Sequence, residues 1–216
     1  MKKSAVFLLT AIFWLSQSAF SIKQAPQKAA FEKAAEKVLR KQILAEAAWA
    51  MQQPPVTITT SFCPRSAGGR HDFFSEADYF WPDPKNPNGP YINRDGLTNP
   101  DNFVEHRKAM IRFSRIIGAL ASAYKLTGDA KYVRQAVIHL KAWFIDPETL
   151  MNPNLLYAQA VKGKFTGRSY GIIDSIHLME VAQGVLVMEN SDAMEPETTA
   201  GGPRAFQGME QGRYRF

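Results

Sequence analysis

Two apolar stripes joined by a three-residue turn constrain the fold of this chain more than any other feature. From residue 101 to 126 apolar side chains recur every three or four positions, and the same period returns over 131–144. Thr127-Gly128-Asp129 separates the stripes, where glycine suits a helix end and aspartate can cap the next helix. Because so short a turn forces neighbouring helices together, the pattern predicts an antiparallel helix pair.

Further helices are predicted on both sides of this pair. Residues 29–53 combine strong helix formers with apolar positions at helical spacing, and Pro54-Pro55 ends that helix. An apolar run over 172–188 predicts another helix, whereas the β-branched residues of 56–62 favour a short extended segment. The predicted fold class is therefore all-α, with little strand content.

The first 21 residues have the character of a secretory signal. Lys2 and Lys3 precede an apolar run, and Ala19 and Ser21 provide the small residues that suit cleavage after Ser21. The run is shorter than the ~20 residues of a membrane-spanning helix. We therefore expect a periplasmic or secreted protein with no membrane association after cleavage. Loss of the two lysines lowers the formal net charge from +6 to +4.

Composition argues against several other classes of protein. The basic residues are scattered and form no nucleic-acid-binding motif, so we expect no nucleic-acid partner. The single cysteine, Cys63, cannot form an internal disulfide. No pair of histidines has a third ligand at metal-binding spacing, so we expect no metal and no other cofactor. His106 lies on the apolar stripe and is expected to be a core residue.

Two long loops carry most of the polar and aromatic side chains that can hold a ligand. The first runs from Ser66 to Asn102 and the second from Asn152 to Gly171. Loops of this length in a compact domain more often serve binding or catalysis than mere connection. Their aromatic faces and their carboxylate, amide and guanidinium groups suit an acidic sugar. We expect the loops to pack against helix ends and to line one concave surface.

From Ser61 to Glu189 the chain carries multi-residue motifs in unbroken order. The first loop holds the sequences SAGG (66–69), HD (71–72), YFWPDP (79–84), GPY (89–91), RDG (94–96) and NPD (99–101). The later motifs are LTGD (126–129), AWF (142–144), MNPNLLYAQ (151–159) and TGR (166–168). Together these motifs resemble the alginate-lyase domain of bacterial polysaccharide lyases.

The resemblance implies a fold and a substrate. The family fold is a toroid of antiparallel helix pairs around a central cleft, so we expect a partial (α/α) toroid with long aromatic-rich loops. The implied substrate is an acidic polysaccharide, alginate or a related uronan, cleaved by β-elimination without a cofactor.

The resemblance also implies that the domain is incomplete. The family continues well beyond the matching region and carries an Asn-His pair and a later proton-donating tyrosine there, but this sequence has no Asn-His dipeptide. We expect a lead-in helix over 22–60, an incomplete lyase domain over 61–189 and a divergent tail over 190–216. That tail is expected to be disordered or altered in reading frame, and the chain by itself is expected to have little activity.

β-Elimination at a uronic acid needs a group that neutralises the carboxylate, a base for the C5 proton and an acid for the departing O4. We assign to catalysis His71, Tyr79, Arg94 and Tyr157, and to substrate binding Trp81, Asn99, Asn154 and Arg168. Structural roles are open for several of these residues. Asn99 can cap a helix, Trp81 can anchor its loop, and Arg94 can belong to a surface turn.

Two alternative functions stay open. The chain can be a catalytically inactive fragment that retains glycan binding. It can also be a glycoside hydrolase on a helical toroid, which needs two carboxylates across the cleft. The carboxylates available for that role are Asp72, Glu76, Asp78 and Asp95. The oligomeric state is not predicted by the sequence.

Overall fold

The structure is a computed structural model that describes residues 30–31, 33–196 and 198. The predicted signal peptide and most of the predicted tail lie outside the described residues. The chain divides into two compact units, residues 1–44 and 45–216. Described residues of the first unit are helical, with an exposed ion pair between Arg40 and Glu36 at 3.1 Å. The second unit opens with helical residues 45–50 and contains all the elements below.

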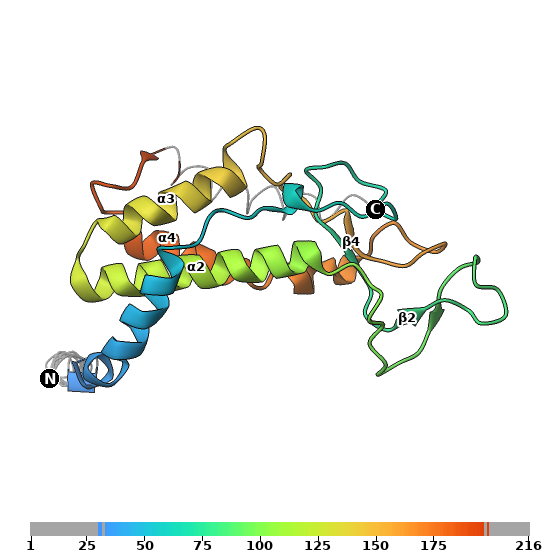
Figure 1. The fold of residues 1–216 in the computed structure, drawn as a ribbon, viewed down its shortest axis with the longest axis horizontal. Coiled ribbons are helices and arrows are strands. Elements are labelled where there is room, and N and C mark those ends of the chain that lie inside the picture. Colours follow the sequence, from blue (N-terminus) through green and yellow to red (C-terminus); the bar gives the residue numbers. More distant parts are fainter. Residues whose placement is uncertain (1–29, 32, 197, 199–216) are drawn as a thin grey trace, which may run out of the picture. The chain divides into compact units, whose positions relative to one another are not determined.

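Three helices build the body of the second unit. Helix α2 spans Glu105–Thr127, α3 spans Lys131–Phe144 and α4 spans Leu178–Met188. Gly128 ends α2 in a left-handed conformation with φ of 71°, and its amide donates to the carbonyl of Tyr124. Helix α3 then runs back along α2, which also packs against α4 (Figure 1). The predicted antiparallel pair is confirmed, and the fold is mainly helical.

Large apolar side chains fill the space between these helices. Phe113 of α2 stacks on Trp143 of α3 with ring centroids 4.6 Å apart. The indole Nε1 of Trp143 donates to the carbonyl of Val56, so the ring is buried without an orphaned donor. Burying each such ring contributes about 1.5–3 kcal/mol. This core fixes α2, whose N-terminal end faces the two loops.

Four short strands lie in the two loops at that end of α2, and one pair of them joins the loops. Strand β1 (Phe74–Glu76) pairs in parallel with β4 (Tyr157–Ala160), and β2 (Phe80–Trp81) pairs antiparallel with β3 (Ile92–Asn93). The β2–β3 hairpin lies beyond the N-terminal end of α2 (Figure 1). The strand content is as small as expected. Phe73 and Phe74 of the first loop are buried beside α2, whereas the β2–β3 hairpin extends away from the helices (Figure 1).

Two segments have a different secondary structure from the one predicted. The segment predicted as extended, 56–62, has a 3₁₀ turn, η1 (Ile58–Thr60), at its centre, because the Thr57 hydroxyl accepts from the Thr59 amide and no strand lies beside it. The predicted helix over 172–188 is broken into a 3₁₀ segment, η2 (Ser169–Ser175), and α4. The break follows from Asp174, whose side chain is drawn into a buried polar network.

Among the described residues, no single helix has both the length and the apolar composition of a membrane span. The bent pair of η2 and α4, with 46° between them, meets those two criteria together.

Candidate active site

The two loops meet along one seam. The side-chain amide of Asn152 donates to the Asp72 carboxylate at 2.8 Å, and the Asn152 backbone amide donates to the carbonyl of His71. Further along, the amide of Tyr91 donates to the carbonyl of Lys162 at 3.0 Å. With the β1–β4 pairing between these points, the seam makes residues of both loops parts of one surface.

His71 is held in one tautomer at this seam. Its Nδ1 lies 2.6 Å from the backbone carbonyl of Leu150, which can only accept a hydrogen bond. Nδ1 therefore carries the proton, and in the neutral ring Nε2 keeps the lone pair. The side chain is half-buried, so this nitrogen can serve as a proton acceptor.

The ring of Tyr157 packs against Gly68, near Asp72, because two glycines leave room for it. A Cβ at Gly68 would lie 2.5 Å from the Tyr157 ring and 2.8 Å from Cβ of Asp72. A Cβ at Gly167 would collide with the backbone of Leu156 and Tyr157. The motifs that carry these glycines thus bring the ring of Tyr157 close to the His71-Asp72 turn.

Cation–aromatic contacts hold two arginines, Arg168 and Arg94, in the loops. The Arg168 guanidinium lies 5.2 Å from the ring centroids of both Phe80 and Tyr170. The Arg94 guanidinium lies 5.5 Å from the ring of Trp81, whose indole Nε1 donates to the Leu97 carbonyl. Each guanidinium is held against an aromatic face, an arrangement that presents cations and flat apolar surfaces together.

Burial affects the pKa of Arg168. Desolvation lowers the pKa of its guanidinium, which stays protonated because the ordinary value is far above neutrality. A partly desolvated cation without a carboxylate partner among the described residues gains interaction energy when an anion arrives. Arg168 is therefore suited to bind an anionic ligand.

Arg168 is positioned by a strained residue. Its Nε donates to the carbonyl of Gln159, which has a left-handed backbone with φ of 56°. The Gln159 amide donates to Ser75 Oγ at 2.8 Å, and Ser75 donates in turn to the Asp174 carboxylate. Arg107 Nε lies 3.0 Å from Asp174 as an ion pair, although not aligned as a hydrogen bond. This network holds the unfavourable conformation of Gln159 in place.

The other three assigned residues, Tyr79, Asn99 and Asn154, make no cation–aromatic contact among the described residues. Tyr79 is 43% exposed, and among the described residues no hydrogen bond involves its hydroxyl. Asn99 is buried, donates to the carbonyl of Phe80 and accepts from the amide of Asp101, so its amide is used to fold the loop. Asn154 accepts from the amide of Leu156 and is half-buried.

The structure also resolves the role of His106. Its Nδ1 accepts from the amide of Phe74 at 3.0 Å, and its Nε2 lies 3.0 Å from the carbonyl of Ser61, to which it donates. Burial lowers the pKa of the imidazole, which favours the neutral form that these two bonds require. The expectation of a core histidine is confirmed. Within the described residues, no group of three His, Cys, Asp or Glu side chains could hold a metal ion.

Sequence reasoning missed the network behind Arg168. Gln159, Ser75, Asp174 and Arg107 were not assigned a role, because each lies in a different element and the contacts are long-range. One signal was available: Asp174 is a single carboxylate in the apolar run from Gly171 to Ile176. A buried carboxylate is costly unless it is paired, so its position already required a cation from elsewhere in the chain.

Comparisons with known proteins agree with this fold. Residues 58–203 match the family model described as alginate lyase. The chain therefore belongs to the alginate lyase family, a family of polysaccharide lyases. Its fold is similar to the crystal structure of an alginate lyase from Bacteroides ovatus, with a TM-score of 0.71 and 35% sequence identity. That match covers 79% of this chain and 46% of the relative, so this chain spans less than half of the relative's length. No curated protein sequence matches it.

Proposed function

We propose that this chain supplies the substrate-binding surface of an exported polysaccharide lyase that cleaves a uronic-acid polymer such as alginate by β-elimination. The observation that carries the proposal is the seam between the two loops, which sets Arg168 and Arg94 against aromatic faces in a chain of the alginate lyase family. Cations neutralise a uronate carboxylate, and flat apolar rings suit the apolar face of a sugar. The complete domain would form an (α/α) toroid.

The proposed reaction assigns a role to each group. Arg168, with Arg94, neutralises the carboxylate on C5, so that negative charge developing there during proton removal is stabilised. The Nε2 lone pair of His71 accepts the C5 proton. The C4–O4 bond breaks as the C4=C5 double bond forms, and the electron pair of the broken bond leaves with O4. Tyr79 or Tyr157 donates the proton that O4 takes up.

Hydrogen bonding within the loops disfavours the hydrolase alternative. Asp72 accepts from Gly69 and Asn152, Glu76 is bound by Arg65, and Asp78 is bound by Arg107. A retaining or inverting hydrolase requires one carboxyl group to carry a proton to the leaving oxygen. These three carboxylates are already engaged within the fold, which leaves Asp95 without a second carboxylate among the four candidates.

The test combines binding with product analysis on the 216-residue chain. Oligomers of several uronic acids are titrated calorimetrically, and the same mixtures are followed in the ultraviolet, where the unsaturated product absorbs. We expect uronate oligomers to bind, and Arg168→Ala to weaken binding by about tenfold or more. Lys125→Ala is the control, because Lys125 is an exposed cation at the other end of α2.

The outcomes separate the candidate functions. Unsaturated product from the chain establishes the lyase. Binding without product establishes the glycan-binding alternative, and new reducing ends without ultraviolet absorption establish the hydrolase. Absence of binding to every uronan overturns the proposal, as does equal weakening by Arg168→Ala and Lys125→Ala.

A further inference from the structure

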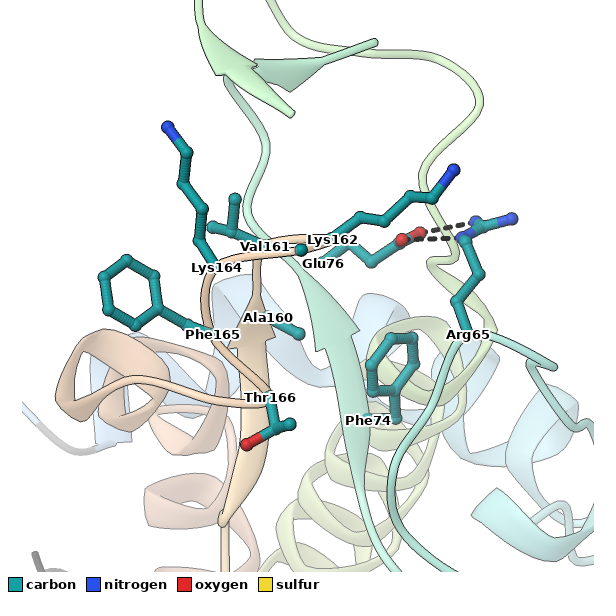
Figure 2. A pocket seen from close by; sticks show the side chains of 10 residues that line it. Arg65, Phe74, Glu76, Ala160, Val161, Lys162, Lys164, Phe165 and Thr166 are labelled. Carbon is teal, nitrogen blue, oxygen red and sulfur yellow. Dashed lines mark hydrogen bonds and ion pairs between the residues drawn. The ribbon is translucent and has the colours of Figure 1, made fainter. Parts of the chain in front are cut away.

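A pocket of about 380 Å³ lies at the C-terminal end of β4, beyond the seam that holds Arg168. Figure 2 shows Lys164 and Phe165 on one side of this pocket and Arg65 with Glu76 on the other. Phe74 and Ala160, which belong to the paired strands β1 and β4, also line it. The pocket is therefore part of the same two-strand junction as the candidate active site, but it contains none of the assigned catalytic residues.

The charge of the pocket is positive. Its lining includes the cations of Arg65, Lys162 and Lys164 and one carboxylate, Glu76. Glu76 is already satisfied, because it binds Arg65 through two oxygens and accepts from the amide of Phe103. Hydrogen bonding to Glu76 raises the pKa of the Arg65 guanidinium, so Arg65 stays protonated. The two lysines remain without a carboxylate partner among the described residues, and a concave surface with a positive net charge concentrates anions.

A tight turn fixes the backbone that carries the two lysines. Val161 and Phe165 form an isolated bridge, and Gly163 between them has φ of 73°. A Cβ at Gly163 would lie 2.8 Å from the backbone of Pro90, so the turn is packed against the first loop. The ammonium of Lys162 also lies 5.5 Å from the ring of Tyr91. The cations of this turn are therefore presented on a rigid element rather than on a free loop.

An exposed aromatic ring completes the pocket. Phe165 is 54% exposed, although it lies in a turn with a defined backbone. Exposed aromatic faces next to cations are the combination found at the seam around Arg168. The pocket begins three residues along β4 from Tyr157, a distance of about 10 Å at the rise of an extended strand. One polymer of acidic sugars can therefore reach both places.

We propose that this pocket is a second subsite, in which Lys164 binds the carboxylate of a further uronate residue and Phe165, on the same side of the pocket, packs against its ring. The inference rests on the proposed function and extends it, because it makes affinity depend on the length of the polymer. A short oligomer occupies only the seam at Arg168, whereas a longer oligomer also reaches the pocket and gains affinity by linked binding.

The experiment compares short and long oligomers of the same uronan on the 216-residue chain and on the variants Lys164→Gln and Phe165→Ala. We expect each variant to weaken binding of the long oligomer by about three- to tenfold and to leave the short oligomer within about twofold. Lys125→Gln, which removes the same charge far from the pocket, should change neither. A neutral oligosaccharide of the same length should not distinguish Lys164→Gln from the parent chain.

The results separate this inference from the proposed function. If Arg168→Ala weakens both oligomers while the pocket variants bind the long oligomer as tightly as the parent chain, the subsite is absent and the proposed function stands. Equal weakening of short and long oligomers by Lys164→Gln also overturns the subsite, since it places Lys164 at the seam. Failure of the parent chain to bind any uronan overturns both proposals.

Discussion

Gln159 is the only non-glycine residue in the described part of the chain with a left-handed backbone. Such a conformation costs of order 1 kcal/mol or more, and it persists where surrounding contacts determine it. Here the contacts are the Ser75 hydroxyl on its amide, Asp174 on its side chain and Arg168 on its carbonyl. Strain at this position therefore sets the direction of the carbonyl that holds Arg168.

Removing the Ser75 hydroxyl tests this link. Ser75→Ala leaves the buried backbone amide of Gln159 without a partner and removes one of the two hydrogen bonds to Asp174 Oδ2, so we expect a loss of about 1–3 kcal/mol in unfolding free energy. We also expect weaker uronate binding, because the Gln159 carbonyl is no longer fixed. Gln159→Gly is the second variant to compare, since glycine adopts positive φ without strain. It also keeps the hydrogen bonds of the backbone amide and the backbone carbonyl. If Gln159→Gly loses as much uronate affinity as Ser75→Ala, the backbone does not position Arg168.

Buried histidines predict a loss of stability in acid. Burial, with the Arg112 charge, lowers the pKa of His139 from 6.5 to about 4, and burial also lowers the pKa of His106. A depressed pKa means that the unfolded chain binds more protons, so stability is complete above pH 6.5 and is lost as the pH falls towards 4. For His139 we expect a loss of about 2 kcal/mol between about pH 7.5 and pH 5.

Chemical denaturation at the two pH values measures this loss. His139→Gln should lower stability at neutral pH, because the buried site is disturbed, but should remove most of the dependence that His139 contributes. An unchanged pH dependence in that variant contradicts the assignment to His139. The exposed carboxylate Asp192 provides a control, because Asp192→Asn should leave the slope between these pH values intact.

At the level of elements, the contact between α2 and α4 depends on a small residue. A Cβ at Gly184 of α4 would lie 2.7 Å from the Cγ2 methyl of Ile117 in α2, and that methyl belongs to a stiff β-branched side chain. The helices approach closely there because glycine leaves room. A larger residue must push the helices apart or force an unfavourable rotamer.

We therefore expect Gly184→Leu to lower the free energy of unfolding by about 1–3 kcal/mol through overpacking. Ser122→Leu is the matched control, because Ser122 is exposed on α2 and the same side chain should change stability by less than about 0.5 kcal/mol there. Thermal or urea unfolding of both variants makes the comparison. Equal stability of the two variants would show that the helices are not in tight contact at Gly184.

The helices were predictable because their signals are local. The stripes of α2 and α3 and the turn at Gly128 predicted both helices and their antiparallel packing, and α3 has the expected bounds. The start of α2 at Glu105 is later than predicted, because Asn99 and Asn102 hold the preceding residues in turns through bonds to distant carbonyls. Contacts of that kind leave no periodic trace in the sequence.

For the candidate site, the sequence predicted residue types but not the contacts between them. Arg168 and Trp81 were assigned from loop composition and family resemblance, and the structure adds their aromatic and carbonyl partners. The parallel pairing of β1 with β4 joins segments more than eighty residues apart, at Phe74 and Tyr157. No sequence pattern in either loop predicts this pairing. The break before α4 likewise follows from Asp174, whose partners lie in other elements.

For the molecule as a whole, the outer face of η2 and α4 is notable because it exposes several large apolar side chains. Met179 and Leu186 are two helical turns apart on α4 and are 60% and 62% exposed. Ile173 of η2 and Ile176, which directly follows η2, are 59% and 58% exposed. Exposed apolar residues in such density mark a surface that contacts other protein. The similar alginate lyase is more than twice as long as the part of it that this chain matches.

From this surface we expect the 216-residue chain to associate with itself at concentrations where a fully covered domain stays monomeric. Leu186→Lys and Met179→Lys should shift the population towards monomer, because a charge on that face opposes apolar contact. Both side chains are exposed, so unfolding free energy should change by less than about 0.5 kcal/mol. Light scattering coupled to size-exclusion chromatography, over a concentration series, measures the effect.

Ile138→Lys is the control for this last prediction, since Ile138 is also a half-exposed aliphatic residue, at 50%, but lies on α3. If the α4 variants become monomeric and Ile138→Lys does not, the association uses the η2–α4 face. If all three variants behave alike, association depends on general surface polarity, and the η2–α4 face has no special part in it. A parent chain that is monomeric throughout the series refutes the prediction outright.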